Sequence, residues 1–370
     1  MATLPRWDPC ISHRGSQVSA FINDYFALVD RAVLLVGGAG FDPRSTFVSS
    51  QLAAVTSNIY AVFLRENRPN PDPALLQCAE ANTNLLVSSI AAQKVVEIEI
   101  FGRDGAVIGG RNAVRALGSQ DFNGITDVVI DISALSVGTS FPIIRYFVER
   151  AERGLGPANI HIFVAHEPEL DASIRSVPSD TPSHVHGFKG GSTLDSFSSA
   201  ARLWLPQLAP GRRAALARLF DFVGPHDTCP ILPFPARNPR LADELAEDYL
   251  QELESTWTVD TRNIVYADES DPLDLYRTIL RLDDRRKPVF AGAGGSLVVL
   301  SPLGSKVMAL GALMAALERD LPVAHVEPIS YSWEGAAQGV SKPPNLVHIW
   351  LEGEVYPAPR PVLRAEGAAN

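Results

Sequence analysis

The most constraining feature of this chain is a strand–turn–helix–strand pattern within residues 297–327. An apolar, β-branched run at Leu297 to Leu300 ends in a tight turn, and the segment Val307 to Arg319 has helical composition. A second β-branched run follows at Val323 to Val326. Two short apolar strands joined through a helix are typical of a parallel sheet with right-handed crossovers. The pattern therefore predicts an α/β fold.

The turn of this unit, residues 301–306 (SPLGSK), is the sharpest candidate binding site. It places backbone N–H groups, two hydroxyls and an ammonium at a helix N-terminus, where phosphate and other anions bind. The spacing of a Walker A motif is absent. The alternative interpretation is a tight turn with a serine cap and a solvated lysine. The expected ligand contacts are Ser301, Gly304, Ser305 and Lys306.

The same order of elements appears earlier, between Val128 and His166. Asp131 ends the apolar strand of this unit, so its carboxylate is expected at the carboxyl edge of the sheet, with Ser133 and Thr139 in the following loop. An alternative role for Asp131 is capping of the next turn. We expect Thr139 and Ser140 at the positions of Ser305 and Lys306. Because this loop has no lysine, the two halves are expected to bind a ligand unequally.

A glycine-rich loop follows another apolar run at residues 32–36. It reads G-x-G-x-x-P from Gly38 to Pro43, and a proline in place of the third glycine prevents the close helix–strand contact of an NAD fingerprint. Asp42 and Arg44 could line a pocket with Gly38, or form a salt bridge within the loop. No cofactor is expected.

The whole pattern predicts an α/β protein of two Rossmann-like lobes, with mostly parallel sheets and helices on both faces. The length of 370 residues is consistent with two domains. We expect a first lobe at 1–170, a linker and loop at 171–212, a second lobe at 213–335, and a C-terminal strand with a Pro-rich tail at 336–370. Further helices are expected at 45–65, 75–93 and 241–253, and further strands at 219–223 and 346–351.

Ligands of parallel α/β sheets bind outside the carboxyl ends of the strands. Four loops therefore become candidate parts of a site: 37–46, 131–140, 224–240 and 301–306.

The bulk properties exclude several classes of partner. A net charge of −10 and a pI near 5.3 argue against duplex nucleic acid as the main ligand, because surfaces that bind it are basic. A small anionic ligand in a local pocket remains compatible. No apolar run reaches the roughly 18 residues of a membrane span, and MATLPRWDPC has no signal-peptide core. The cysteines and histidines lack metal-site spacing, so no metal is expected. The three cysteines are expected to be reduced thiols, as in a cytoplasmic protein.

The strand, turn and helix at 297–319 resemble the CARF domain, the CRISPR-associated Rossmann-like sensor. The residues that carry the resemblance are 303–311, LGSKVMALG. Two such units in one chain resemble the SAVED arrangement of anti-phage signalling systems. The resemblance implies binding of a cyclic oligonucleotide between the lobes. The contacts that it implies are Gly304, Ser305 and Lys306 in one lobe and Asp131, Ser133 and Thr139 in the other.

Three functions follow from these observations. The leading hypothesis is a sensor of an anionic nucleotide ligand in bacterial defence. Since no nuclease, TIR or membrane effector is recognised, a protein partner would give the output. The second is a metal-independent phosphodiesterase, with Ser305, Lys306 and Thr139 stabilising the developing charge. The third is a non-catalytic adaptor that docks a partner through its Pro-rich segments.

Overall fold

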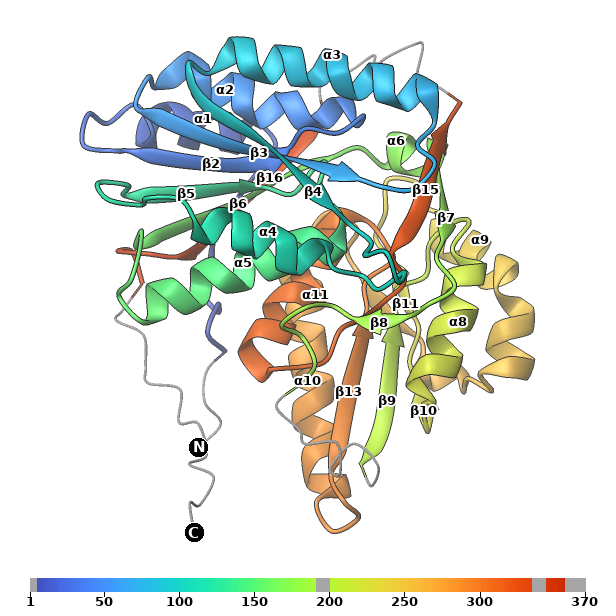
Figure 1. The fold of residues 1–370 in the computed structure, drawn as a ribbon. Coiled ribbons are helices and arrows are strands. Elements are labelled where there is room, and N and C mark those ends of the chain that lie inside the picture. Colours follow the sequence, from blue (N-terminus) through green and yellow to red (C-terminus); the bar gives the residue numbers. More distant parts are fainter. Residues whose placement is uncertain (1–4, 191–199, 335–343, 357–370) are drawn as a thin grey trace.

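The computed structural model describes residues 5–190, 200–334 and 344–356. Two sheets, set at a steep angle to each other, are surrounded by helices (Figure 1). The predicted α/β class with two Rossmann-like lobes is confirmed. The expected Pro-rich tail after residue 356 lies outside the described residues.

The first lobe is built on a seven-stranded sheet in the order β1-β16-β6-β5-β2-β3-β4. The five strands from β6 to β4 are parallel, whereas β16 is antiparallel to β6 and to β1. The strands are β1 (Ile11–Arg14), β2 (Val33–Gly38), β3 (Ile59–Asn67), β4 (Ala92–Glu99), β5 (Asp127–Asp131), β6 (Asn159–His166) and β16 (Asn345–Glu352).

Helices cover both faces of this sheet (Figure 1). One face packs on α1 (Ser16–Tyr25), α2 (Phe47–Val55) and α3 (Pro73–Ser89), through a cluster that includes Leu35, Phe63 and Phe163. The opposite face packs on α4 (Gly109–Gly118) and α5 (Val137–Glu152). The alternation of strand side chains between the two faces accounts for strands that are apolar throughout.

The second lobe repeats the topology of the first. Parallel strands β13 and β10 flank β9, single parallel bridges add β11 at Gln207–Ile231 and β14 at Leu300–Val323, and β12 pairs with β11. The resulting order, β12-β11/β10-β9-β13-β14, matches β4-β3-β2-β5-β6. The strands are β9 (Ala201–Pro206), β10 (Asp227–Thr228), β11 (Ile231–Pro233), β12 (Val265–Ala267), β13 (Ser296–Ser301) and β14 (Ala324–His325). The helices are α8 (Arg213–Val223), α9 (Leu241–Asp248), α10 (Pro272–Phe290) and α11 (Lys306–Arg319).

The lobes share one hydrophobic core. A single cluster of buried side chains extends from Ile130 in the first sheet through Phe141 of α5 to Leu310 and Leu313 of α11. Helix α11 contacts both α5 and β6, and it lies between the two sheets in Figure 1. The core therefore joins the lobes into one packed body.

Two expected elements are wrong. The helix expected at 45–65 is a short 3-10 turn, η1 (Pro43–Thr46), followed by α2 and then by strand β3. The polar residues Thr56 to Asn58 separate the helix from the strand. The strand expected at 219–223 is the end of α8, because Leu216, Leu219 and Val223 are spaced to bury one helical face.

The segment expected as a linker contains regular structure. After α6 (Pro168–Ser173) come β7 (Ile174–Pro178) and β8 (Ser183–His184), and then β9, the central strand of the second sheet. Strand β7 pairs with β15 (Pro328–Trp333) as an antiparallel ribbon beside the carboxyl ends of both sheets (Figure 1). The second lobe therefore begins inside residues 171–212.

Candidate functional site

A cavity of about 410 Å³ lies where the carboxyl ends of the two sheets meet. The loops after β2, β5 and β13 all contribute to its wall, as does the β7–β15 ribbon. This is the position at which parallel α/β sheets bind ligands. Its lining is mostly apolar, which is typical of small-molecule sites. The titratable side chains in the wall are Asp42, Arg44, Arg65, Glu66, Arg68, Asp72, Asp171, Arg212, Lys306, His325 and Tyr331.

The structure brings some of the predicted site residues to the cavity and leaves others behind it. Asp42, Arg44, Gly304 and Lys306 line it. The wall formed by the described residues does not include Gly38, Asp131, Ser133, Thr139, Ser301 or Ser305. Loop 224–240 also lies outside the wall, and part of it forms β10 and β11. Three of the four expected loops thus meet at one place.

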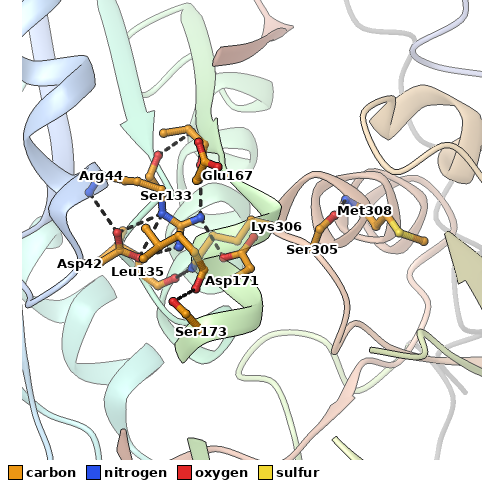
Figure 2. Close-up of polar contacts among 12 residues, drawn as sticks. Asp42, Arg44, Ser133, Leu135, Glu167, Asp171, Ser173, Ser305, Lys306 and Met308 are labelled. Atoms are coloured by element: carbon orange, nitrogen blue, oxygen red, sulfur yellow. Dashed lines mark hydrogen bonds and ion pairs between the residues drawn. The ribbon is translucent and has the colours of Figure 1, made fainter. Parts of the chain in front are cut away.

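Lys306 is the first residue of α11 and reaches across to the other lobe. Its Nζ donates a hydrogen bond to the carbonyl oxygen of Leu135, in the loop after β5 (Figure 2). Burial lowers the pKa of Lys306, and the nearby Arg44 guanidinium lowers it further. Ser305 Oγ instead accepts from the N–H of Met308 at 3.2 Å, as a helix cap. Lys306 is therefore a half-buried amine with donor capacity at the N-terminus of α11.

Arg44 is held between two carboxylates. Its Nη2 lies 2.6 Å from Asp42 Oδ2, and its Nη1 lies 2.8 Å from Asp171 Oδ1 (Figure 2). Burial opposes the charge of the guanidinium, but Asp42 and Asp171 raise the pKa of Arg44 overall. Asp42 Oδ1 also accepts from the N–H of Arg44 at 3.0 Å and caps η1. The alternative of a salt bridge within this loop is confirmed.

A second network, which the sequence did not indicate, spans the lobes. Arg68 Nη2 lies 2.8 Å from Glu66 Oε2 and 2.6 Å from Glu327 Oε1. The other oxygen of Glu66 accepts from the backbone N–H and the hydroxyl of Ser136, both at 3.0 Å. Burial would raise the pKa of Glu66, but Arg68 and Ser136 lower it overall. Glu66 therefore binds as an anion at the N-terminus of α5.

Asp131 and Ser133 are structural. The hydroxyl of Ser133 donates to Asp131 Oδ1 and accepts from the N–H of Ala165 at 2.7 Å. The pair thus fastens the end of β5 to β6. Burial raises the pKa of Asp131 to about 7. The predicted ligand role of these two residues is not supported by their placement.

The remaining predicted residues also have structural partners. Ser301 Oγ accepts from Trp204 Nε1 at 2.9 Å and donates to the carbonyl of Ala324 at 3.0 Å. A Cβ on Gly38 would lie 2.9 Å from the carbonyl oxygen of Ala134, so this site requires glycine. Thr139 Oγ1 lies 3.1 Å from Ser136 Oγ.

The alignment of the two turns shifts by three residues. The N-cap of α5 is Ser136, so Ser136 rather than Thr139 corresponds to Ser305. Val137 then corresponds to Lys306, so the first residue of α5 is valine where that of α11 is lysine.

Sequence reasoning missed Glu66, Arg68, Arg212 and His325. Glu66 and Arg68 lie at the end of β3, which was expected as helix. His325 closes β14, and Arg212 precedes α8 in the segment expected as linker. Charged residues directly after the apolar run 59–64 are the signal that could have found the first pair.

Comparison with known proteins shows no family for this chain. No family model and no curated protein matches this chain. Among solved structures, the precorrin-6y C5,15-methyltransferase from Geobacter metallireducens GS-15 matches 48% of this chain and 79% of its own, at 14% identity and a TM-score of 0.22. Within residues 5–190, 200–334 and 344–356, every helix is too short or too polar to span a bilayer. That part of the chain also holds no metal-binding group of three or more His, Cys, Asp or Glu side chains.

Proposed function

We propose that this protein is a cytoplasmic sensor of a nucleotide-type anion, which it binds between its two lobes. The observation that carries the proposal is the cavity at the meeting carboxyl ends of two sheets of the same topology, with Lys306 in its wall. The resemblance of residues 303–311 to CARF and SAVED sensors suggests cyclic oligonucleotides as the signal and anti-phage defence as the setting.

The wall of the cavity offers two kinds of chemistry, as a nucleotide does. Its apolar side chains include Phe41, Leu75 and Tyr331, and the rings of Phe41 and Tyr331 are 5.4 Å apart. Aromatic rings of this kind stack on nucleobases. The Tyr331 ring already carries the Arg68 guanidinium, 5.1 Å from its centroid. Lys306 and the N–H groups of the turn, in the same wall, suit a phosphate. A ligand that joins a planar base to an anion would meet both.

The shared core bears on how binding would reach a partner. Because α5 and α11 pack in one cluster, a large hinge movement of the lobes would disrupt buried contacts. The ribbon of β7 and β15 is better placed, since Ser176 and Pro178 face the cavity while Val177 is 51% exposed. We propose that a protein partner reads the outer face of this ribbon.

Binding is favoured over cleavage by the placement of the hydroxyls. The phosphodiesterase alternative requires Ser305 and Thr139 at the ligand. Ser305 caps α11, and Thr139 is fully buried behind the wall. The adaptor alternative rests on the Pro-rich segments 224–240 and 356–362. In the first, Ile231 and Leu232 are buried in the second lobe. Residues 357–362 of the second lie outside the described residues.

The proposal is tested by thermal shift with ribonucleoside mono- and triphosphates and cyclic di-, tri- and tetranucleotides. A ligand at 100 times its Kd should add about 2.7 kcal/mol to the free energy of unfolding. The stabilisation should disappear in Lys306→Met and persist in Lys287→Met, whose lysine is half exposed and paired with Asp283. If no nucleotide shifts the wild-type melting temperature, the proposed function is wrong.

A further inference from the structure

The two equivalent helix N-termini at the cavity are occupied differently. At α5, Glu66 accepts from the N–H and hydroxyl of Ser136, and Arg68 bridges Glu66 to Glu327. The Glu327 carboxylate also lies against the first turn of α5, since a Cβ on Gly138 would be 2.3 Å from its Oε2. The position at which this lobe would bind a phosphate therefore already holds two carboxylates of the protein itself.

The first turn of α11 holds no such internal anion. Gly304 N–H donates to the neutral amide oxygen of Gln207 at 3.3 Å, and Met308 N–H donates to Ser305 Oγ. Within the described part of the chain, the side chains that accept from these N–H groups are thus uncharged. The nearby charges are the ammonium of Lys306 and the Arg44 guanidinium with its paired carboxylates, Asp42 and Asp171. Because these two carboxylates are already paired with Arg44, the Lys306 ammonium can complement an added anion.

An unsatisfied polar atom lies in the same part of the wall. His325 lines the cavity with a side chain only 10% exposed, and its Nδ1 has no hydrogen-bond partner among the described residues. Its Nε2 is 3.6 Å from Glu327 Oε2, and burial lowers the pKa of the ring. A neutral ring with its proton on Nε2, toward the carboxylate, leaves Nδ1 as an acceptor. Buried acceptors without a partner are rare in folded proteins.

We propose that the cavity takes a ribose phosphate with a single phosphate group, bound at α11 by Lys306 and the turn, and that the His325 ring turns on binding so that its Nδ1, which is covered in the free protein, accepts from a ribose hydroxyl. Glu66 and Glu327 exclude a second phosphate at α5. This inference rests on the proposed function and narrows its ligand class. Nucleoside monophosphates fit it, whereas cyclic dinucleotides, which present phosphates on opposite sides, do not. The inference therefore departs from the cyclic oligonucleotides that the CARF and SAVED resemblance suggests.

The anion part is tested without any nucleotide. Crystals of the whole protein soaked in tungstate should show one anomalous peak, at the first turn of α11, and Lys306→Met should remove it. Glu327→Gln should allow a second peak at α5. A wild-type peak at α5, or none at α11, would overturn the inference. A peak at α11 without binding of any nucleotide would contradict the proposed function and the ribose part of the inference, and would leave only the anion site.

The hydroxyl part is tested by calorimetry with the four ribonucleoside 5′-monophosphates and their 2′,3′-dideoxy analogues. The ribonucleotide that binds most tightly should bind roughly tenfold more tightly than its dideoxy analogue, because one buried hydrogen bond contributes about that much to affinity. The variants His325→Phe and His325→Leu should each bind the ribonucleotide and its dideoxy analogue with equal affinity. Equal binding to the wild type, or tighter binding of a cyclic dinucleotide, contradicts the inference.

Discussion

Nδ1 of His161 lies 3.1 Å from Nε2 of His348, inside the sheet of the first lobe. The contact belongs to a row that crosses four neighbouring strands. His13 Nδ1 is 2.9 Å from His348 Nδ1, and His161 Nε2 is 3.1 Å from Asp127 Oδ1. The row ends at Asp127, which also accepts from the hydroxyl of Tyr25 at 2.8 Å and lies 3.8 Å from Arg31. Aromatic side chains of α1 cover it: Phe21, Tyr25 and Phe26.

This row predicts a loss of stability in mild acid. Burial lowers the pKa of His13, His161 and His348, and for His348 the two neighbouring histidines lower it further. The unfolded histidines titrate near pH 6.5, so the stability contributed by the neutral row is complete above that pH. As the pH falls below it, the unfolded chain binds protons that the folded chain does not. The free energy of unfolding should drop by up to about 1.4 kcal/mol per pH unit for each histidine.

Urea unfolding between pH 7.5 and 5 measures this slope. His348→Gln should reduce it, whereas His226→Gln, at an exposed histidine, should leave it unchanged. Asp131 titrates in the same window, because burial raises its pKa to about 7. Its folded form binds a proton that the unfolded chain does not, so it opposes the loss of stability as the pH falls. The difference between the wild type and His348→Gln therefore measures the row, and equal slopes for the two would contradict the prediction.

The chain offers a matched pair of aspartate–arginine loops for a second prediction. Asp42 with Arg44 and Asp260 with Arg262 have the same spacing and the same cap, but the Arg44 side chain is 2% exposed and that of Arg262 is 87% exposed. Arg44→Met removes the partner of the buried Asp42 and of the partly exposed Asp171 and should cost about 3–5 kcal/mol. Arg262→Met should cause no measurable change. Equal effects in urea unfolding would contradict the role given to burial.

Ser301 yields a third prediction, which separates folding from binding. Ser301→Ala removes the acceptor of the buried Trp204 indole N–H and should lower the free energy of unfolding by about 1–3 kcal/mol. Ligand affinity should stay unchanged, because Ser301 lies behind the cavity wall. Ser119→Ala, at an exposed hydroxyl, is the control. If Ser301→Ala instead loses ligand binding while its stability is unchanged, Ser301 belongs to the binding site.

The sequence predicts those strands whose neighbours in the chain are also their neighbours in space. Strand β13 with α11, and β5 with α5, were recognisable because an apolar run, a turn and a helix follow directly. Strand β3 was missed because only three polar residues, Thr56 to Asn58, separate its apolar run from that of α2. In a run this short, the apolar pattern of a buried strand cannot be told from that of a buried helix. Strand β9 was missed because it follows a Ser- and Gly-rich segment that is typical of linkers.

The site was predictable only where a single loop contains it. Lys306, Gly304 and the Asp42–Arg44 pair stand in turns with recognisable chemistry. The contact between Arg68 and Glu327, by contrast, joins two lobes. Nothing local indicates that Glu66 would fill the anion position of α5. The asymmetry of the two helix N-termini therefore required the structure.

Strand β16 has a consequence for how the protein is made. It lies between β1 and β6, so the sheet of the first lobe is incomplete until residue 352 has been synthesised. Until then the nascent first lobe exposes the unpaired edge of β6, where other strands can add. The first half of the chain is thus translated first but completed last, and its assembly waits for the whole of the second lobe.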